Sequence, residues 1–225
     1  RNVKQIAYQI LVATSKLNLE KNMGDVWSSG KIDSEETVNI LFGSNNLKPN
    51  QYYYVKVWVK TNNGDETWSK PAFFTIGFLN TFEWKAKWIG YDKAFSWDSV
   101  SQWSRLSARY FRKEFNTQKT IKKAFVNLVG LGMYELHING RKIGNKVLTP
   151  APTDYLKTVL SNTYDVTEHI KKGKNAIGVI LGNGRFFTMR QDYKPQKINN
   201  FGYPKLLFQL DIIYTDGSMR TVISD

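Results

Sequence analysis

Apolar and polar residues alternate along several short stretches of this chain, and turn residues separate the stretches. In residues 134–138 apolar side chains alternate with Glu and His, and Asn139-Gly140 follows at once. Period-two alternation predicts a strand with one buried face, and Asn-Gly predicts a two-residue hairpin turn because both residues tolerate positive φ. The return strand should begin near Lys142. Asn139 and Gly140 are therefore expected to have a structural role.

The first third of the chain continues this pattern. The apolar stretches 7–14, 26–32 and 37–42 each predict a strand or the end of one. Residues 53–60 alternate across a longer strand, and residues 72–76 supply a closing strand. Short strands separated by turn signals indicate a β-sandwich.

The remaining two thirds are also rich in predicted strands. Residues 108–116 alternate, residues 122–150 supply two or three strands around the hairpin, and residues 175–181 form an apolar strand. Residues 205–225 predict a second hairpin, whereas only residues 165–172 look briefly helical. The fold class is therefore all-β, with two consecutive β-sandwiches, the second of jelly-roll type.

The first sandwich resembles a fibronectin type III domain. Leu47, Pro49 and Tyr53 match the L-x-P-x-x-x-Y pattern that opens a late strand in that family. The resemblance implies that the Tyr53 hydroxyl ties a corner of the sandwich to nearby backbone. All three residues are expected to be structural, and the domain to act as a spacer.

Composition and charge exclude some classes of function. The 225 residues carry a net charge of +13, which raises the question of nucleic-acid binding, but Lys and Arg are spread along the chain without a basic helix. We therefore expect no nucleic-acid partner. No apolar run approaches the ~18 residues of a membrane-spanning helix. Cysteine is absent, which excludes disulfides and thiolate sites. The first residue is Arg1 rather than Met, which favours an excised or processed product.

Read together, the motifs of the second part resemble the N-terminal region of bacterial α-L-rhamnosidases. The resemblance is carried by their order and spacing over about 140 residues, within the segments 87–90, 108–115, 134–155, 164–184 and 206–218. It implies a fibronectin type III- or immunoglobulin-like domain at 1–78. It also implies an accessory, galactose-binding-like sandwich at 79–225 that is incomplete at its C-terminus.

The resemblance also implies a glycoside hydrolase as the parent protein. The family hydrolyses terminal α-L-rhamnosides with inversion, which needs a carboxylic acid and a carboxylate base about 6.5–9.5 Å apart. In the family both groups lie on an (α/α)6 barrel that follows the sandwiches. We therefore expect no catalytic residue in these 225 residues, and no activity from this chain alone. Its expected partners are its own catalytic domain and rhamnose-containing oligo- or polysaccharides.

One loop has residue types suited to a sugar. Arg185, Phe186, Tyr193 and Phe201 offer aromatic faces and a polar donor, and binding residues often lie on loops. Packing of this loop against the catalytic domain is the competing interpretation, and the favoured one. Some relatives bind rhamnose through calcium on such a domain, but Lys146 near the hairpin would repel a cation. We therefore expect no metal and no cofactor.

Two further function classes stay open from the sequence. A stand-alone carbohydrate-binding or adhesion module would use the same sandwiches without a catalytic domain. A nucleic-acid-binding protein comes last, since only the net charge favours it. The length of the parent reading frame distinguishes a stand-alone module from part of a hydrolase. Several hundred further residues with helical periodicity would indicate the hydrolase.

Overall fold

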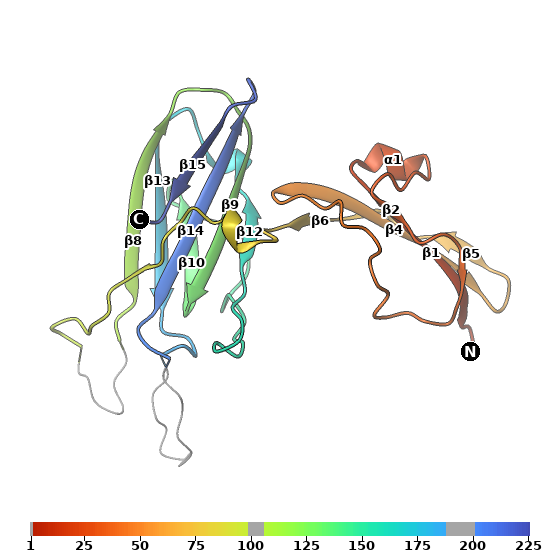
Figure 1. The fold of residues 1–225 in the computed structure, drawn as a ribbon, viewed down its shortest axis with the longest axis horizontal. Coiled ribbons are helices and arrows are strands. Elements are labelled where there is room, and N and C mark those ends of the chain that lie inside the picture. The colour runs from red at the N-terminus through yellow and green to blue at the C-terminus, as the bar shows by residue number, and fades with distance from the viewer. Residues whose placement is uncertain (1, 99–105, 188–200) are drawn as a thin grey trace, which may run out of the picture. The chain divides into compact units, whose positions relative to one another are not determined.

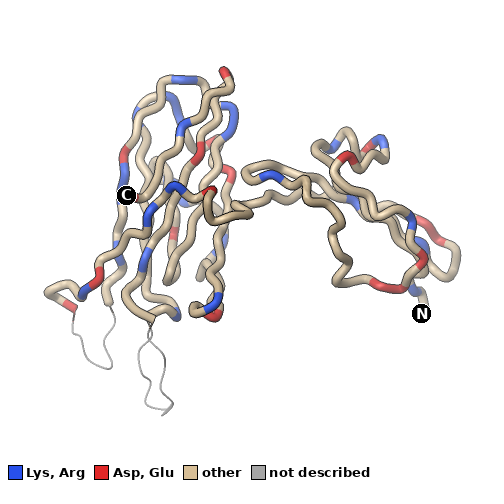
Figure 2. Tube along the Cα trace, in the orientation of Figure 1, with Lys and Arg blue, Asp and Glu red and all other residues tan. Residues whose placement is uncertain are grey.

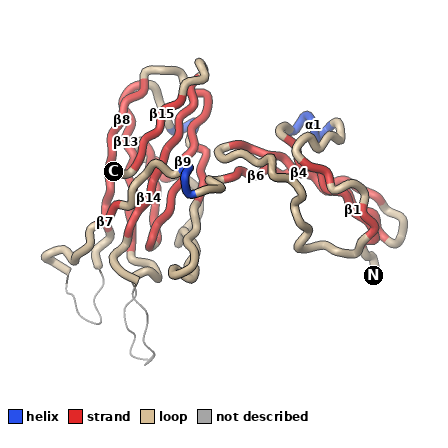
Figure 3. The backbone as a smooth tube through the Cα atoms, viewed as in Figure 1, coloured by secondary structure: helices blue, strands red, loops and turns tan. Residues whose placement is uncertain are grey.

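The computed structural model describes residues 2–98, 106–187 and 201–225. The chain divides into two compact units, Arg1–Leu79 (unit 1) and Asn80–Asp225 (unit 2). Strands dominate both units, and helices are short (Figure 3). The fold is all-β, as the sequence predicts.

The strands of unit 1 form one hydrogen-bonded sheet of six strands, in which β1 and β4 are central (Figure 1). Its elements are β1 (Gln5–Ala13), α1 (Lys16–Glu20), β2 (Trp27–Ser28), β3 (Ile32–Asp33), β4 (Gln51–Thr61), β5 (Glu66–Trp68) and β6 (Ala72–Ile76). β1 pairs antiparallel with β2, β3 and β4, and β4 pairs with β5 and β6.

The predicted strand at residues 37–42 is wrong. The structure gives this segment no regular secondary structure, and its side chains face solvent, with Val38 66% and Leu41 88% exposed. A strand needs a hydrogen-bonded neighbouring strand, and this segment has none among the described residues. Its contact with the rest of the unit is made by the Phe42 ring, whose centroid lies 5.1 Å from that of Trp27. The five-residue helix α1 was not predicted, although Ser15 caps it by accepting a hydrogen bond from the Asn18 N–H at 3.2 Å.

The central strand β4 buries side chains that its pattern does not single out. Lys56 and Trp58 are each 7% exposed, whereas the alternating valines Val55, Val57 and Val59 are only half-buried. The Lys56 ammonium lies 4.3 Å from the centroid of the Trp68 ring and donates to Asn22 Oδ1 at 2.5 Å. The aliphatic stem of Lys56 is therefore buried while its charge is held by a ring face and an amide.

Tyr53 ties β4 to the segment that precedes it. Its side chain is 1% exposed, and its hydroxyl accepts a hydrogen bond from the backbone N–H of Lys48 at 2.7 Å. Leu47 and Pro49, the other two residues of the motif, are half-buried on either side of Lys48. This is the corner that the fibronectin-like pattern implies.

Unit 2 consists of two antiparallel sheets that enclose one core (Figure 1). One sheet has the order β11-β10-β13-β8, and the other has the order β12-β9-β14-β15, with β7 also paired to β14. The elements are η1 (Thr81–Glu83), β7 (Ile89–Gly90), β8 (Arg109–Thr117), β9 (Ile121–Leu131), β10 (Met133–Ile138), β11 (Arg141–Lys142), β12 (Asn162–Asp165), η2 (Thr167–His169), β13 (Gly173–Gly182), β14 (Lys205–Tyr214) and β15 (Met219–Ile223). Leu136 and Val179 from one sheet pack in the same core as Leu128 and Leu210 from the other.

The hairpin β10–β11 has the predicted two-residue turn. Asn139 and Gly140 both have positive φ, 52° and 80°, and Ile138 pairs with Arg141 across the turn. The Asn139 side chain also bonds outside the hairpin. Its Nδ2 donates to the His169 carbonyl at 2.8 Å, and its Oδ1 accepts from the Ala176 N–H at 3.0 Å. One asparagine therefore supplies the turn conformation and fastens it to β13.

Charged residues of both signs occur along both units. Figure 2 shows Lys and Arg interspersed with Asp and Glu along the described parts of each unit. Several of the cations are paired, as in Lys119–Asp216 at 2.7 Å and Lys205–Asp92 at 2.7 Å. The α-helix that the described residues contain, α1, is far too short to cross a bilayer.

Candidate functional site

Loops and strand ends gather at one end of unit 2. β8 begins there with Arg109 opposite Leu181 of β13, and β10 begins with Met133 opposite Gly182. The described segments 91–98, 183–187 and 201–204 continue from this end (Figure 1). Loops held by the ends of rigid strands are where binding residues collect, so this end is the candidate site.

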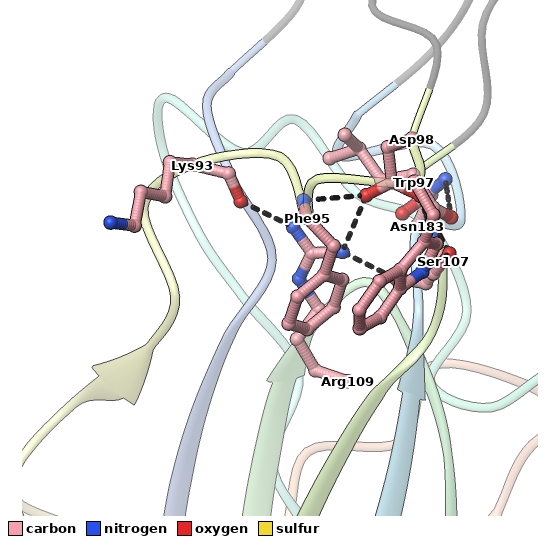
Figure 4. Close-up of polar contacts among 8 residues, drawn as sticks. Lys93, Phe95, Trp97, Asp98, Ser107, Arg109 and Asn183 are labelled. Carbon is pink, nitrogen blue, oxygen red and sulfur yellow. Dashed lines mark hydrogen bonds and ion pairs between the residues drawn. The ribbon is translucent and has the colours of Figure 1, made fainter.

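A buried ion pair holds the segment before β8. The side chains of Arg109 and Asp98 are 2% and 3% exposed, with Arg109 Nη1 3.9 Å from Asp98 Oδ2. Arg109 also donates through Nη2 to the Lys93 carbonyl at 2.8 Å and through Nη1 to the Ser107 carbonyl (Figure 4). The guanidinium is thus fixed by several groups rather than by the carboxylate alone, which is what a buried charge requires.

The Asp98 carboxylate accepts three hydrogen bonds from neighbouring groups. It accepts from the Phe95 N–H at 2.9 Å, from the Ser107 N–H at 3.0 Å and from the Ser107 hydroxyl at 2.6 Å. The pKa of Asp98 lies below its ordinary value, chiefly because the Ser107 hydroxyl donates a hydrogen bond to the carboxylate. The positive charge of Arg109 lowers this pKa further. These donors and the ion pair with Arg109 hold the charged carboxylate in place, so Asp98 fastens the segment before β8.

Three aromatic rings stack beside this ion pair. The Phe95 ring centroid lies 4.9 Å from that of Tyr91 and 4.8 Å from that of Trp97, with interplanar angles of 15° and 11°. The Arg109 guanidinium carbon is 4.7 Å from the Phe95 centroid. The Trp97 indole N–H donates to Ser107 Oγ at 3.1 Å, yet 71% of Trp97 is exposed (Figure 4). Trp97 is therefore held in one orientation while most of its surface faces solvent.

Asn183, from the Gly182-Asn183-Gly184 motif, joins the same cluster. Its Nδ2 donates to the Leu106 carbonyl at 3.0 Å, while its buried Oδ1 has no hydrogen-bond partner among the described residues. Gly184 has a φ of 52°, a region that favours glycine, and the motif ends β13. The sequence interpretation of a strand-ending turn fits this geometry, and Asn183 connects the turn to the segment before β8.

The predicted sugar-binding residues lie near this cluster, except Tyr193, which falls outside the described residues. Phe186 is 7% exposed, with its ring centroid 6.0 Å from that of Phe201 and 5.3 Å from that of Tyr155. The Phe201 N–H donates to the Phe186 carbonyl at 3.0 Å. Arg185 is exposed. The burial of Phe186 favours a packing role for this ring, and a sugar contact stays a prediction for Arg185, Phe201 and the undescribed Tyr193.

Sequence reasoning missed Tyr155, Arg109 and Trp97. Burial raises the pKa of Tyr155, whose ring meets both Phe186 and Phe201. The burial of Arg109 could have been predicted, because Arg109 lies on the same face of its strand as Phe111 and Phe115, which pack against the core. Trp97 had none, since its stacking partners are set by the path of an irregular loop.

Several carboxylates of the described residues are stabilised in their charged form by neighbouring donors and cations. The carboxyl pKa lies below its ordinary value at five of the described residues: Asp25, Glu66, Asp98, Glu135 and Asp216. No group of three or more His, Cys, Asp and Glu is placed to share a metal ion in the part of the chain that the structure describes.

Comparison with known families assigns both units. Residues 1–80 match the Rha78A-like N-terminal immunoglobulin domain, and residues 119–225 match the α-L-rhamnosidase N-terminal domain. The two units belong to these two rhamnosidase domain families. The family assignment agrees with the resemblance that the sequence motifs carry.

Individual relatives are similar to this chain over nearly all of its length. An α-L-rhamnosidase of Formosa agariphila is 35% identical over 98% of this chain, and one of Alteromonas sp. is 31% identical over all of it. The solved α-L-rhamnosidase of Dictyoglumus thermophilum covers the whole chain at 40% identity with a TM-score of 0.78. The α-L-rhamnosidase of Aspergillus terreus does so at 28% identity with a TM-score of 0.75. The chain covers about a quarter of each of these proteins, 24% or 25%.

Proposed function

We propose that these two rhamnosidase-type units are the non-catalytic N-terminal portion of an α-L-rhamnosidase. The observation that carries the proposal is the match of almost the whole chain to one quarter of the length of several rhamnosidases. The chemistry would then belong to a catalytic domain outside these residues, acting on terminal α-L-rhamnosides with inversion.

Within that protein, the loop end of unit 2 acts mainly as a docking scaffold. Phe186, Phe201 and Tyr155 pack on one another, and Phe187 stacks with Tyr203 at 5.6 Å. These paired rings hold together the two chain segments that leave the sandwich, which suits a rigid support. A direct contact of Arg185 and Phe201 with rhamnose-containing glycans is the finer part of the proposal.

Deletion of residues 1–225 from the longer protein tests the proposal against the alternative of an independent binding module. A scaffold predicts that the remaining protein aggregates or loses activity on small aryl and polymeric rhamnosides alike. A binding module predicts unchanged kcat/KM on an aryl α-L-rhamnoside and a loss confined to polymeric substrates. Circular dichroism of the truncated protein checks whether the catalytic part has stayed folded.

A further inference from the structure

The positive charge of the chain lies almost entirely in unit 2. Residues 80–225 contain 23 Lys and Arg against 12 Asp and Glu, whereas residues 1–79 contain 9 against 7. Unit 2 therefore carries +11 of the formal net charge of +13. Self-repulsion of this charge opposes the folding of the unit, and a bound polyanion would relieve it.

Much of this charge is gathered at the end of unit 2 opposite the loop end, which we call the turn end (Figure 1). The segments 116–123, 139–142, 165–174 and 215–220 connect the strands there. Together they contain nine Lys and Arg against three Asp and Glu. Figure 2 shows Lys and Arg in blue along these connections. The turn end is therefore a basic surface built from four separate parts of the chain.

Three of these cations lie on one turn whose backbone is fixed by a buried side chain. Asn175 is 3% exposed, and its Oδ1 accepts a hydrogen bond from the Lys171 N–H at 2.9 Å. Its Nδ2 donates to the carbonyls of Lys171 at 2.7 Å and Gly173 at 3.0 Å. Gly173 has a φ of 93°, a region that favours glycine. Lys171, Lys172 and Lys174 are all exposed on this fixed turn.

The same buried asparagine joins the lysine turn to the hairpin that carries Arg141. The Asn139 side chain donates to Asn175 Oδ1 at 2.9 Å and to the His169 carbonyl at 2.8 Å. Arg141 follows directly in the hairpin and is exposed. The two basic turns therefore share one support, and a ligand that contacts both orders little backbone on binding.

The lysines of the turn are not neutralised within the described chain. Lys119, at the same end, pairs with Asp216 at 2.7 Å. Lys171, Lys172 and Lys174 have no ion pair among the described residues. Like charges within a Debye length of about 10 Å repel one another, so this cluster attracts a ligand with several negative groups.

An acidic polysaccharide fits the turn end better than a nucleic acid does. Sites for nucleic acids combine cations with exposed aromatic rings that stack on bases or with a helix that enters a groove. The four segments of the turn end contain no Phe, Trp or Tyr, and their regular helix is the three-residue η2. Carboxylate or sulfate groups along a polysaccharide need only cations that follow the chain.

We propose that the turn end of unit 2 binds an acidic polysaccharide through Lys171, Lys172, Lys174 and Arg141. Asn139 and Asn175 are positioning residues that hold the two turns and do not contact the ligand. The choice of a polysaccharide among polyanions rests on the proposed function above, because a rhamnoside hydrolase acts on glycans.

The test is calorimetric titration of the 225-residue chain with polygalacturonate and dextran sulfate, as carboxylated and sulfated probes. Neutral dextran is the control polymer. We expect both anionic polymers to bind at about 50 mM salt, and the affinity to fall about tenfold or more at about 200 mM salt, because binding releases counterions. Dextran should give no binding heat.

Two triple variants decide whether the turn end or the total charge is responsible. Lys171→Ser/Lys172→Ser/Lys174→Ser should lower the affinity for both probes about tenfold or more. Lys85→Ser/Lys87→Ser/Lys93→Ser removes the same charge from exposed positions around β7 and should change the affinity less than about twofold. Unchanged backbone amide signals of Asn139 and Asn175 will establish that the support is intact.

The outcomes separate this inference from the proposed function. Absence of binding to both anionic polymers at low salt, or equal losses in the two triple variants, overturns the binding surface. Tighter binding of duplex DNA than of either polymer, at equal concentration of anionic groups, overturns the choice of a polysaccharide. Polymer binding that depends on the lysine turn, with a longer protein that hydrolyses no rhamnoside, supports the surface and counts against the proposed function.

Discussion

Asn139 is predicted to be the most sensitive single position in the β10–β11 hairpin. Its side chain makes three hydrogen bonds, to the His169 carbonyl at 2.8 Å, to Asn175 Oδ1 at 2.9 Å and from the Ala176 N–H at 3.0 Å. Its φ of 52° lies in the left-handed region. Two substitutions separate these contributions, since Asn139→Gly keeps the conformation and loses the bonds, whereas Asn139→Ala loses both.

The magnitudes follow from the bonds and the backbone. Three intramolecular hydrogen bonds at about 1 kcal/mol each give a loss of about 3 kcal/mol in the free energy of unfolding for Asn139→Gly. Alanine adds roughly 1–2 kcal/mol for a left-handed residue with a Cβ, offset by up to about 1 kcal/mol because glycine is more flexible when unfolded. We therefore expect a loss of about 4 kcal/mol for Asn139→Ala.

Urea unfolding of the whole chain, followed by NMR at resolved methyl groups, measures both losses. Methyls of Leu136 and Val179 report the unit 2 core, where the transition midpoint should fall. Methyls of Leu11 report unit 1 and serve as an internal control, because their transition should not move. A change of less than about 0.5 kcal/mol for Asn139→Gly, well below the ~3 kcal/mol expected from three bonds, would refute the role of the side-chain network. A larger loss for Asn139→Gly than for Asn139→Ala would refute the argument from φ.

Three further predictions address other contacts. Tyr53→Phe should lower the free energy of unfolding of unit 1 by roughly 1 kcal/mol through loss of the 2.7 Å bond from the Lys48 N–H, and an unchanged urea midpoint at unit 1 methyls would contradict this. Phe186→Ala should destabilise unit 2 by about 3 kcal/mol, because the Phe186 ring is only 7% exposed. Phe187→Ala should cost less, because Phe187 is only half-buried, and equal shifts in melting temperature for the two variants would mean that Phe186 is not a packing residue. Asp98 has a lowered pKa in the folded chain, so its stabilisation is present above the ordinary pKa of about 4 and is lost as pH falls further. The stability gap between the parent and Asp98→Asn should therefore shrink between neutral and acidic pH, and a gap that stays constant would argue against the shift.

Features set by neighbouring residues were predictable from the sequence. The Asn139-Gly140 turn depends on two adjacent residues that tolerate positive φ, and it forms where the pattern places it. Tyr53 likewise bonds to backbone only five residues upstream. The strands around both features follow from alternation that continues into a buried face.

Features set by distant contacts were not predictable. Residues 37–42 have an apolar pattern but lack a strand neighbour, which alternation alone does not reveal. Lys56 can be buried because its ammonium group donates a hydrogen bond to Asn22 Oδ1 and lies over the face of the Trp68 ring. Trp97 stays exposed because a loop anchored by Arg109 holds it outward, so the candidate site depends on a tertiary ion pair.

The most direct test of the central claim is hydrolysis of an aryl α-L-rhamnoside by two polypeptides, these 225 residues alone and a longer protein that carries them. We expect the longer protein to release the aryl group, with NMR showing that the sugar is first formed with inverted anomeric configuration. The 225 residues alone should give no turnover above buffer. Inhibitor-sensitive turnover by the 225 residues, or a folded longer protein inactive on every rhamnoside tried, would contradict the account.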